Sequence, residues 1–146
     1  MSALDELVRE GKVLYVGAGG RQMHSWNYAD YWWVAEHRGY SKPVSAQVEW
    51  SLIERKNEKT IVAACERFGI GVIPFFPLAA GLLTGKYTRG AEVPADSRMS
   101  LPGYRSLLTD ENFDRVSALT QIADAGGTVL LDLALGWWHR DHRSQA

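Results

Sequence analysis

The stretch Pro43–Phe76, PVSAQVEWSLIERKNEKTIVAACERFGIGVIPFF, decides the fold. Its beginning has the two-residue period of a strand, because Val44, Ala46 and Val48 alternate with polar residues. These three side chains predict one apolar face, and Gln47 is expected to point away from it. The rest of the stretch predicts a helix and then a further strand, so that it forms one strand–helix–strand unit.

The helix of this unit is predicted over Glu58–Phe68, where apolar residues recur at helical spacing, and Gly69 ends it. Cys65 falls on the apolar face of this helix, which favours a small core residue over a nucleophile. The continuous apolar run Gly71–Phe76 is typical of a strand that is buried on both faces of a parallel sheet.

The preceding segment has the same strand-and-helix alternation. Ser2 is expected to cap a short helix that Gly11 stops, and Lys12–Val16 predicts a strand. Residues Gly17–Gly20 are interpreted as a flexible turn between this strand and an aromatic-rich helix over Ser25–Arg38. Strands therefore begin near residues 12, 43 and 70, and each is followed by a helix.

The segment that follows the unit is less regular. Leu78–Leu108 is predicted to be mostly loop, and a loop of this length is usually functional. Thr109 is expected to cap a helix, and Thr128 a last helix that runs to Trp138. We therefore expect one domain over residues 1–138 and a polar tail over residues 139–146.

Alternating strands and helices predict an α/β fold with a parallel sheet and right-handed crossovers. An open doubly wound sheet and a closed barrel both have this alternation. The periodicity alone does not decide between them.

Composition excludes several classes of function. The 16 basic and 17 acidic side chains nearly balance, which argues against nucleic-acid binding. No apolar run reaches the roughly 20 residues of a membrane helix, so membrane insertion is not expected. Cys65 is the single cysteine, which fits a reducing compartment, and we expect a cytoplasmic protein.

Two glycine-rich motifs have the wrong spacing for nucleotide-binding signatures. Gly17–Gly20 lacks the third glycine of a dinucleotide fingerprint, because residue 22 is Gln22. Gly81–Tyr87 is one residue too short for a P-loop and ends in tyrosine. Its backbone and lysine can still hold a phosphate, or the motif is a structural turn, and spacing leaves both open. His139 and His142 are too few ligands for a metal site.

Three segments together resemble the aldo-keto reductase family. They are similar to the helix leading into the family's fifth strand, to its sixth strand, and to its seventh strand with the pyrophosphate loop. The segments are residues 4–17 (LDELVREGKVLYVG), 44–52 (VSAQVEWSL) and 75–87 (FFPLAAGLLTGKY). The similarity extends from about residue 3 to Trp138 and covers roughly half of the family's length.

The resemblance implies a partial (β/α)8 TIM barrel, with about three parallel strands and flanking helices that do not close. It also implies NADP(H) as cofactor and the reduction of aldehydes and ketones as the family reaction. Gln47 would hydrogen-bond the nicotinamide carboxamide, and Trp50 would stack on the nicotinamide ring. The diphosphate would be held by a group of loop residues, namely Phe76, Pro77, Leu78, Ala79, Ala80, Lys86 and Arg98.

The chain departs from the family pattern in the cofactor contacts. Gly19 and Gly20 stand where the family has a serine followed by asparagine or arginine, and Phe76 stands where it has a serine. Each lost contact is expected to weaken cofactor binding by roughly 1 kcal/mol or more.

The family's catalytic Asp, Tyr, Lys and His have no match in this chain, so we assign no catalytic and no metal-binding residue. The resemblance therefore implies a fragment that is inactive alone. Three strands cannot close a barrel, and we expect a strand-donating or oligomeric partner to complete the sheet. The alternatives are a non-enzymatic interaction module, similar to the family's channel regulatory subunits, and a truncated or degenerate gene product.

Overall fold

The computed structural model describes residues 1–20 and 22–141, with side chains as far as Trp137. The chain divides into two compact units, described here one at a time. The first unit is Met1–Glu49 with Lys56–Phe75, and the second is Trp50–Arg55 with the chain from Phe76 onward. The first holds α1 (Ser2–Arg9), β1 (Val16–Gly19), α2 (Ser25–Arg38), β2 (Pro43–Glu49), the π-helix η1 (Glu58–Val62), α3 (Ala63–Phe68) and β3 (Gly71–Phe75). The second holds the 3-10 turns η2 (Ala79–Thr84), η3 (Arg98–Ser100) and η4 (Arg105–Leu107), then α4 (Asp110–Ala125) and α5 (Leu130–Asp141).

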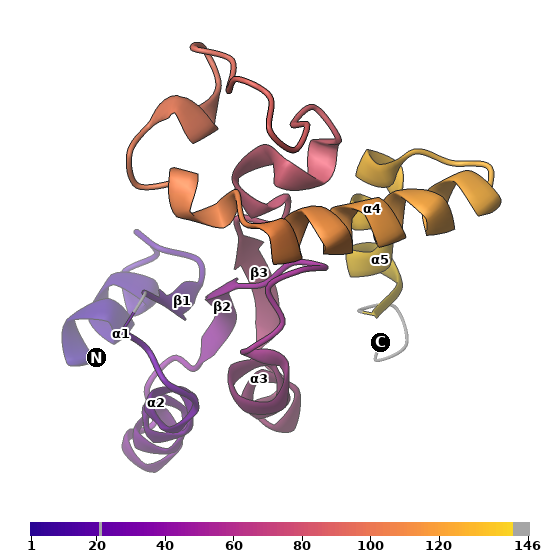
Figure 1. Cartoon of the computed structure of the whole chain (residues 1–146). Coiled ribbons are helices and arrows are strands. Elements are labelled where there is room, and N and C mark those ends of the chain that lie inside the picture. Colours follow the sequence, from indigo (N-terminus) through magenta and orange to yellow (C-terminus); the bar gives the residue numbers. More distant parts are fainter. Residues whose placement is uncertain (21, 142–146) are drawn as a thin grey trace. The chain divides into compact units, whose positions relative to one another are not determined.

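The first unit is built on a parallel three-stranded sheet in the order β1-β2-β3 (Figure 1). The register places Gly19 beside Gln47, and Gln47 beside Ile73. Helix α2 connects β1 to β2, and η1 with α3 connects β2 to β3. This is the repeating βα arrangement of a partial barrel with an open sheet, as the sequence predicts.

Strand side chains are buried on the face of the sheet that the helices cover. Ala46, Val48 and Val72 are all buried. Helices α2 and α3 pack against each other, with the Trp32 and Phe68 rings 5.4 Å apart. Their apolar stripes and these strand residues together form the core of the unit.

The opposite set of strand side chains is open. Ile73 is 51% exposed, and Gln47 and Gly71, which share its side of the sheet, are exposed as well. The prediction that the third strand is buried on both faces is therefore wrong, because in this unit helices cover one face only.

The first strand begins later than predicted. The backbone N–H groups of Lys12 and Val13 donate to the carbonyl of Leu7, so these residues complete the C-terminal turn of α1. The strand is instead Val16–Gly19, which corrects the interpretation of Gly17–Gly20 as a flexible turn. Glycine is required there, because an added Cβ at Gly19 would lie 2.8 Å from the Cβ of Gln47.

The second unit has its own hydrophobic core. Leu83, Met99, Val116 and Leu130 are buried in it, from η2, η3, α4 and α5. Thr109 caps α4 as predicted, since its hydroxyl accepts the backbone N–H of Asn112 at 3.2 Å. The predicted loop over residues 78–108 contains only short 3-10 turns.

The last helix differs from its prediction at both ends. It begins at Leu130, because the backbone N–H of Thr128 donates to the Ala123 carbonyl and closes the end of α4. It continues to Asp141, so the predicted boundary of the polar tail falls inside a helix. Residues 142–146, with His142, and the side chain of His139 lie outside the description.

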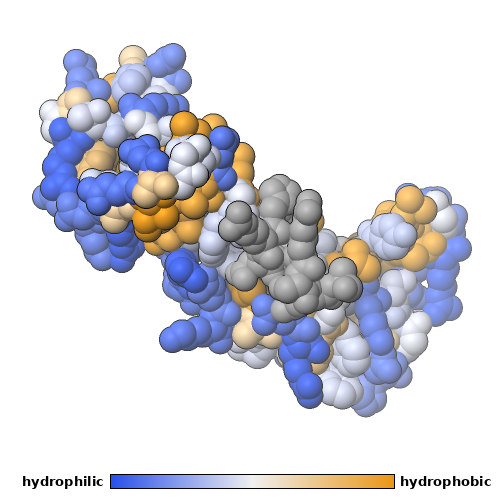
Figure 2. All heavy atoms as spheres, turned by 90° about the vertical axis from the view of Figure 1, so that its right-hand side faces the viewer, coloured by the Kyte–Doolittle hydropathy of each residue, from blue (hydrophilic) through white to orange (hydrophobic). Residues whose placement is uncertain are grey.

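Hydrophobic residues also reach the surface, where Figure 2 shows them among hydrophilic ones. The largest exposed fractions belong to Leu14 (78%), Tyr15 (73%) and Trp26 (60%). No single described helix is long and apolar enough to cross a membrane; α4 and Leu130–Trp137 meet that test only as a pair bent by 92°.

Asp5 fastens α1 to the segment before β2. Its carboxylate accepts the backbone N–H of Ser41 at 2.7 Å and the Ser41 hydroxyl at 2.9 Å, and it pairs with Arg9 at 2.7 Å. The hydrogen bond from the Ser41 backbone, with the Ser41 hydroxyl and Arg9, outweighs burial and holds the pKa of Asp5 below its ordinary value.

We expect Asp5→Asn to lower the melting temperature at neutral pH and not at acid pH. The pKa is lowered in the folded state, so the stabilisation is complete above the unfolded pKa of about 4 and is lost as pH falls through the folded value. Thermal unfolding of both proteins between pH 2 and 7 measures this, with the exposed Asp30→Asn as control. Equal melting temperatures at pH 7 would contradict the role of Asp5.

Candidate functional site

The loop after β3 has an unusual backbone. Phe76, Ala79 and Ala80 have positive φ angles of 55°, 48° and 55°, and no other non-glycine residue of the described chain does. Such conformations cost about 1–3 kcal/mol each and persist where the surroundings impose them, often at ligand sites. Here the Phe76 carbonyl accepts the N–H of Ala79 at 2.8 Å, and the fully buried Leu83 anchors the loop in the core.

This loop surrounds a cavity of about 360 Å³, which we call the loop cavity. Two cationic side chains, Lys86 and Arg98, line it, and no acidic residue does. The remaining lining residues are Phe76, Pro77, Leu78, Ala80 and Gly81. Six of the seven residues predicted to hold a diphosphate therefore meet at one cavity, and the seventh, Ala79, is buried beside them in sequence.

The chemistry of the loop cavity suits an anion. Two cations without a carboxylate give the cavity a positive potential, which favours an anion. Gly81 has a φ of +101°, and its Cβ position lies at ordinary contact distance, 3.5 Å, from Lys86 Cε and from the Tyr87 hydroxyl. A side chain at residue 81 would therefore be disfavoured by backbone strain rather than by a clash with the lysine.

Aromatic rings hold the arginine of the loop cavity. The Arg98 guanidinium lies 5.8 Å from the centre of the Phe76 ring and 5.9 Å from that of Tyr104. The two rings meet edge to face at 5.7 Å. Both contacts are within cation–π range.

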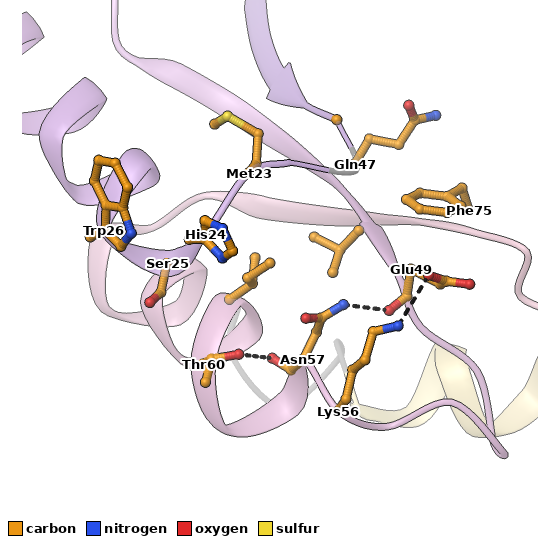
Figure 3. A pocket seen from close by; sticks show the side chains of 13 residues that line it. Met23, His24, Ser25, Trp26, Gln47, Glu49, Lys56, Asn57, Thr60 and Phe75 are labelled. Atoms are coloured by element: carbon orange, nitrogen blue, oxygen red, sulfur yellow. Dashed lines mark hydrogen bonds and ion pairs between the residues drawn. The ribbon is translucent and has the colours of Figure 1, made fainter.

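The first unit has a second pocket, of about 660 Å³, at the C-terminal ends of its strands (Figure 3). We call it the strand-end pocket. Figure 3 shows Gln47 and Phe75 on one side of it and His24 and Trp26 on the other. Gln47 is exposed, as the alternation in β2 predicts, and Figure 3 shows its carboxamide directed away from Glu49, Lys56 and Asn57.

The base of the strand-end pocket is polar and fixed by hydrogen bonds. Glu49 pairs with Lys56 at 3.3 Å, and its backbone carbonyl accepts the Asn57 side-chain amide at 3.0 Å. On the other wall, the His24 backbone N–H donates to the Asn27 side chain at 2.8 Å and fixes the start of α2. The pocket therefore combines an amide, an ion pair and two aromatic rings, which suits a small polar ring compound.

Trp50, predicted to stack on the nicotinamide ring, belongs to the second unit. There it is 2% exposed and packs edge to face on Trp137 at 5.1 Å. Phe75 instead brings an aromatic ring to the pocket that contains Gln47. Phe75 is not among the residues predicted from the sequence, although alternation along β3 places it on the same side as Ile73, the register partner of Gln47.

Gly19 and Gly20 lie where the sequence analysis expects lost cofactor contacts. Gly20 lines the strand-end pocket and brings no side chain to it. Gly19 has no space for one, since its Cβ position is 2.8 Å from Gln47 Cβ. The close approach of Gln47 therefore requires glycine at residue 19.

Other reactive groups are sequestered. Burial raises the pKa of the Cys65 thiol to about 11 and that of Tyr28 to about 12. Cys65 is fully buried, so the thiol stays protonated and acts as a core residue, as predicted. Within residues 1–20 and 22–141, no cluster of three His, Cys, Asp or Glu side chains is arranged to bind a metal.

Comparison with known proteins supports the resemblance to the aldo-keto reductase family. A sequence model described as the aldo/keto reductase family matches residues 1–145. The chain is 34% identical to an aldo-keto reductase, dtxS3, of Metarhizium robertsii, over 96% of this chain and 37% of that protein. It is 33% identical to the L-glyceraldehyde 3-phosphate reductase of Escherichia coli K12 (97% and 42%). It is also 33% identical to a probable voltage-gated potassium channel subunit beta of Arabidopsis thaliana (92% and 42%). The chain spans about two fifths of the length of these relatives.

Proposed function

Because the chain belongs to the aldo/keto reductase family, we propose that it is the nucleotide-holding part of an NADP(H)-dependent carbonyl reductase. The loop cavity is the main support for this proposal. It is lined by two cations and by no carboxylate, and the loop around it has a strained backbone. These residues lie in the part of the chain that the family model matches. A diphosphate is the group that such a cavity suits best.

The strand-end pocket supports the nicotinamide end of the proposal. A carboxamide recognises a carboxamide through one donor and one acceptor, and Gln47 presents both. We propose that Phe75 supplies the ring contact, because it lines the pocket that contains Gln47, whereas the Trp50 ring is buried against Trp137. The loss of side chains at Gly19 and Gly20 leaves fewer hydrogen bonds for the cofactor, so we expect weak binding.

We also propose that the chain does not reduce carbonyl compounds alone. Reduction needs a proton donor at the carbonyl oxygen as well as a hydride. None of the family's Asp, Tyr, Lys and His positions is matched in this sequence. The chain therefore binds and orients the nucleotide, and the proton donor comes from outside it.

Titration of the full chain with NADPH, followed by NADPH fluorescence, tests this function. We expect saturable binding with a dissociation constant in the micromolar range or weaker, and no consumption of NADPH with an aldehyde present. Gln47→Ala should weaken binding about fivefold or more, the loss typical of a hydrogen bond in a binding site. Gln121→Ala, an exposed glutamine on α4, is the matched control. Absence of saturable binding, or turnover of the aldehyde, would refute the proposal.

A second candidate function is assembly with another polypeptide. Leu14 and Tyr15 precede β1 and are more than 70% exposed, and β1 pairs only with β2 among the described strands. Exposed apolar side chains beside an open strand edge suit a partner that adds a strand to the sheet. The similarity to a potassium channel subunit beta is consistent with such a role.

Light scattering coupled to size-exclusion chromatography tests assembly. We expect the full chain to run as an oligomer or with a bound partner, and Leu14→Asp with Tyr15→Asp to run as a monomer. Lys12→Asp, also exposed and nearby, is the control for added negative charge. A wild-type monomer over the whole concentration range would exclude self-assembly.

A further inference from the structure

We propose that Phe76 is a positioning residue, which together with Tyr104 holds the Arg98 guanidinium in place at the loop cavity for a diphosphate-bearing ligand. The inference rests on the proposed function, which gives the cavity its ligand. The resemblance places Phe76 where the family has a serine, so a hydroxyl contact is lost there. We infer that the Phe76 ring makes a contribution of its own by positioning Arg98.

The backbone of Phe76 is held in a conformation that aromatic residues rarely adopt. Its φ is 55°, in the left-handed region, and its carbonyl accepts the Ala79 N–H at 2.8 Å. Glycine would adopt this conformation without strain. An aromatic residue under strain at the rim of a cavity indicates that the ring itself is needed there.

The ring of Phe76 is one of two that contact the same cation. Arg98 lies 5.8 Å from the Phe76 ring centre and 5.9 Å from that of Tyr104, and the rings are perpendicular at 5.7 Å. Tyr104 packs against the hydrophobic core of the second unit. Its own position is therefore fixed independently of Arg98.

Arg98 is an exposed residue, and contacts restrain it at both ends. Its neighbour in η3, Met99, is fully buried and anchors the backbone. The two rings restrain the guanidinium at the far end of the side chain. An arginine restrained before the ligand arrives loses less side-chain freedom on binding, which strengthens binding without an added contact. The ring of Phe76 thus offsets the missing hydroxyl.

Isothermal titration of the full chain with inorganic pyrophosphate tests the inference through a double-mutant cycle. We expect Arg98→Ala to weaken binding at least about tenfold, as for loss of a charged hydrogen bond. Phe76→Leu should weaken binding about threefold to tenfold in the wild type and hardly at all in Arg98→Ala, because both changes affect one interaction. Phe76→Tyr, which keeps the ring, should restore wild-type affinity. Additive effects, or wild-type affinity in Phe76→Leu, would overturn the inference.

A measurement without ligand separates this inference from the proposed function. The ¹⁵Nε order parameter of Arg98 should be high in the wild type and in Phe76→Tyr, and low in Phe76→Leu, while exposed Arg105 is unchanged. If pyrophosphate does not bind but this pattern holds, the proposed function fails and the positioning role stands. If pyrophosphate binds and the order of Arg98 does not depend on residue 76, the positioning role fails alone.

Discussion

Trp50→Ala is expected to lower the free energy of unfolding by about 3–5 kcal/mol, the loss typical of a large aromatic side chain removed from a core. Trp50 is 2% exposed and its ring meets that of Trp137 at 5.1 Å. Truncation leaves a cavity that its neighbours fill only in part. Urea unfolding followed by far-UV circular dichroism measures the change. Trp33→Ala, half exposed on α2, is the control, with an expected loss below about 1 kcal/mol.

A second variant of residue 50 tests whether Trp50 is only a core residue or also contacts the nicotinamide. Trp50→Phe keeps an aromatic core residue and should leave the affinity for NADPH unchanged in folded protein, whereas Phe75→Leu should reduce it. A folded Trp50→Phe variant that loses affinity for NADPH, beside a Phe75→Leu variant that keeps it, would support the stacking role that the sequence predicts for Trp50.

Removal of both cations from the loop cavity should give the largest loss of binding. We expect Lys86→Ala with Arg98→Ala to lower the affinity for pyrophosphate by at least about 100-fold, because each charge-assisted hydrogen bond contributes about 1.5–3 kcal/mol. Both cations line the same cavity of about 360 Å³. Isothermal titration at fixed ionic strength measures the change.

A matched variant tests whether such a loss of affinity comes from the change in net charge alone. Lys59→Ala with Arg105→Ala removes two exposed cations outside the loop cavity and should keep the affinity within about threefold. The wild type should also bind pyrophosphate less tightly as salt rises, and the double variant of the cavity should lose most of this dependence. Equal losses in the two double variants would mean a non-specific attraction.

The sequence predicts the elements whose signals are local. Helix α2 runs over Ser25–Arg38 as expected, with Gly39 in the left-handed conformation at its end, and Thr109 caps α4. These features depend on neighbouring residues alone. The family segments also predict the loop cavity, because its seven lining residues come from a short stretch and from Arg98.

The features that the sequence does not show depend on contacts between distant residues. Gly17 and Gly19 look like a turn in sequence, and only the proximity of β2 shows that they form a strand in which a Cβ would collide. The burial of Trp50 against Trp137, 87 positions later, has no local signal in the sequence either. The place of Phe75 near Gln47 depends on the register between β2 and β3.

The crowding between Gly19 and Gln47 has a consequence for protein engineering. Any side chain introduced at residue 19 would put its Cβ 2.8 Å from that of Gln47, a separation that Cβ atoms essentially never show. A redesign that adds a polar group at residue 19 would therefore have to change residue 47 or widen the space between β1 and β2 at the same time.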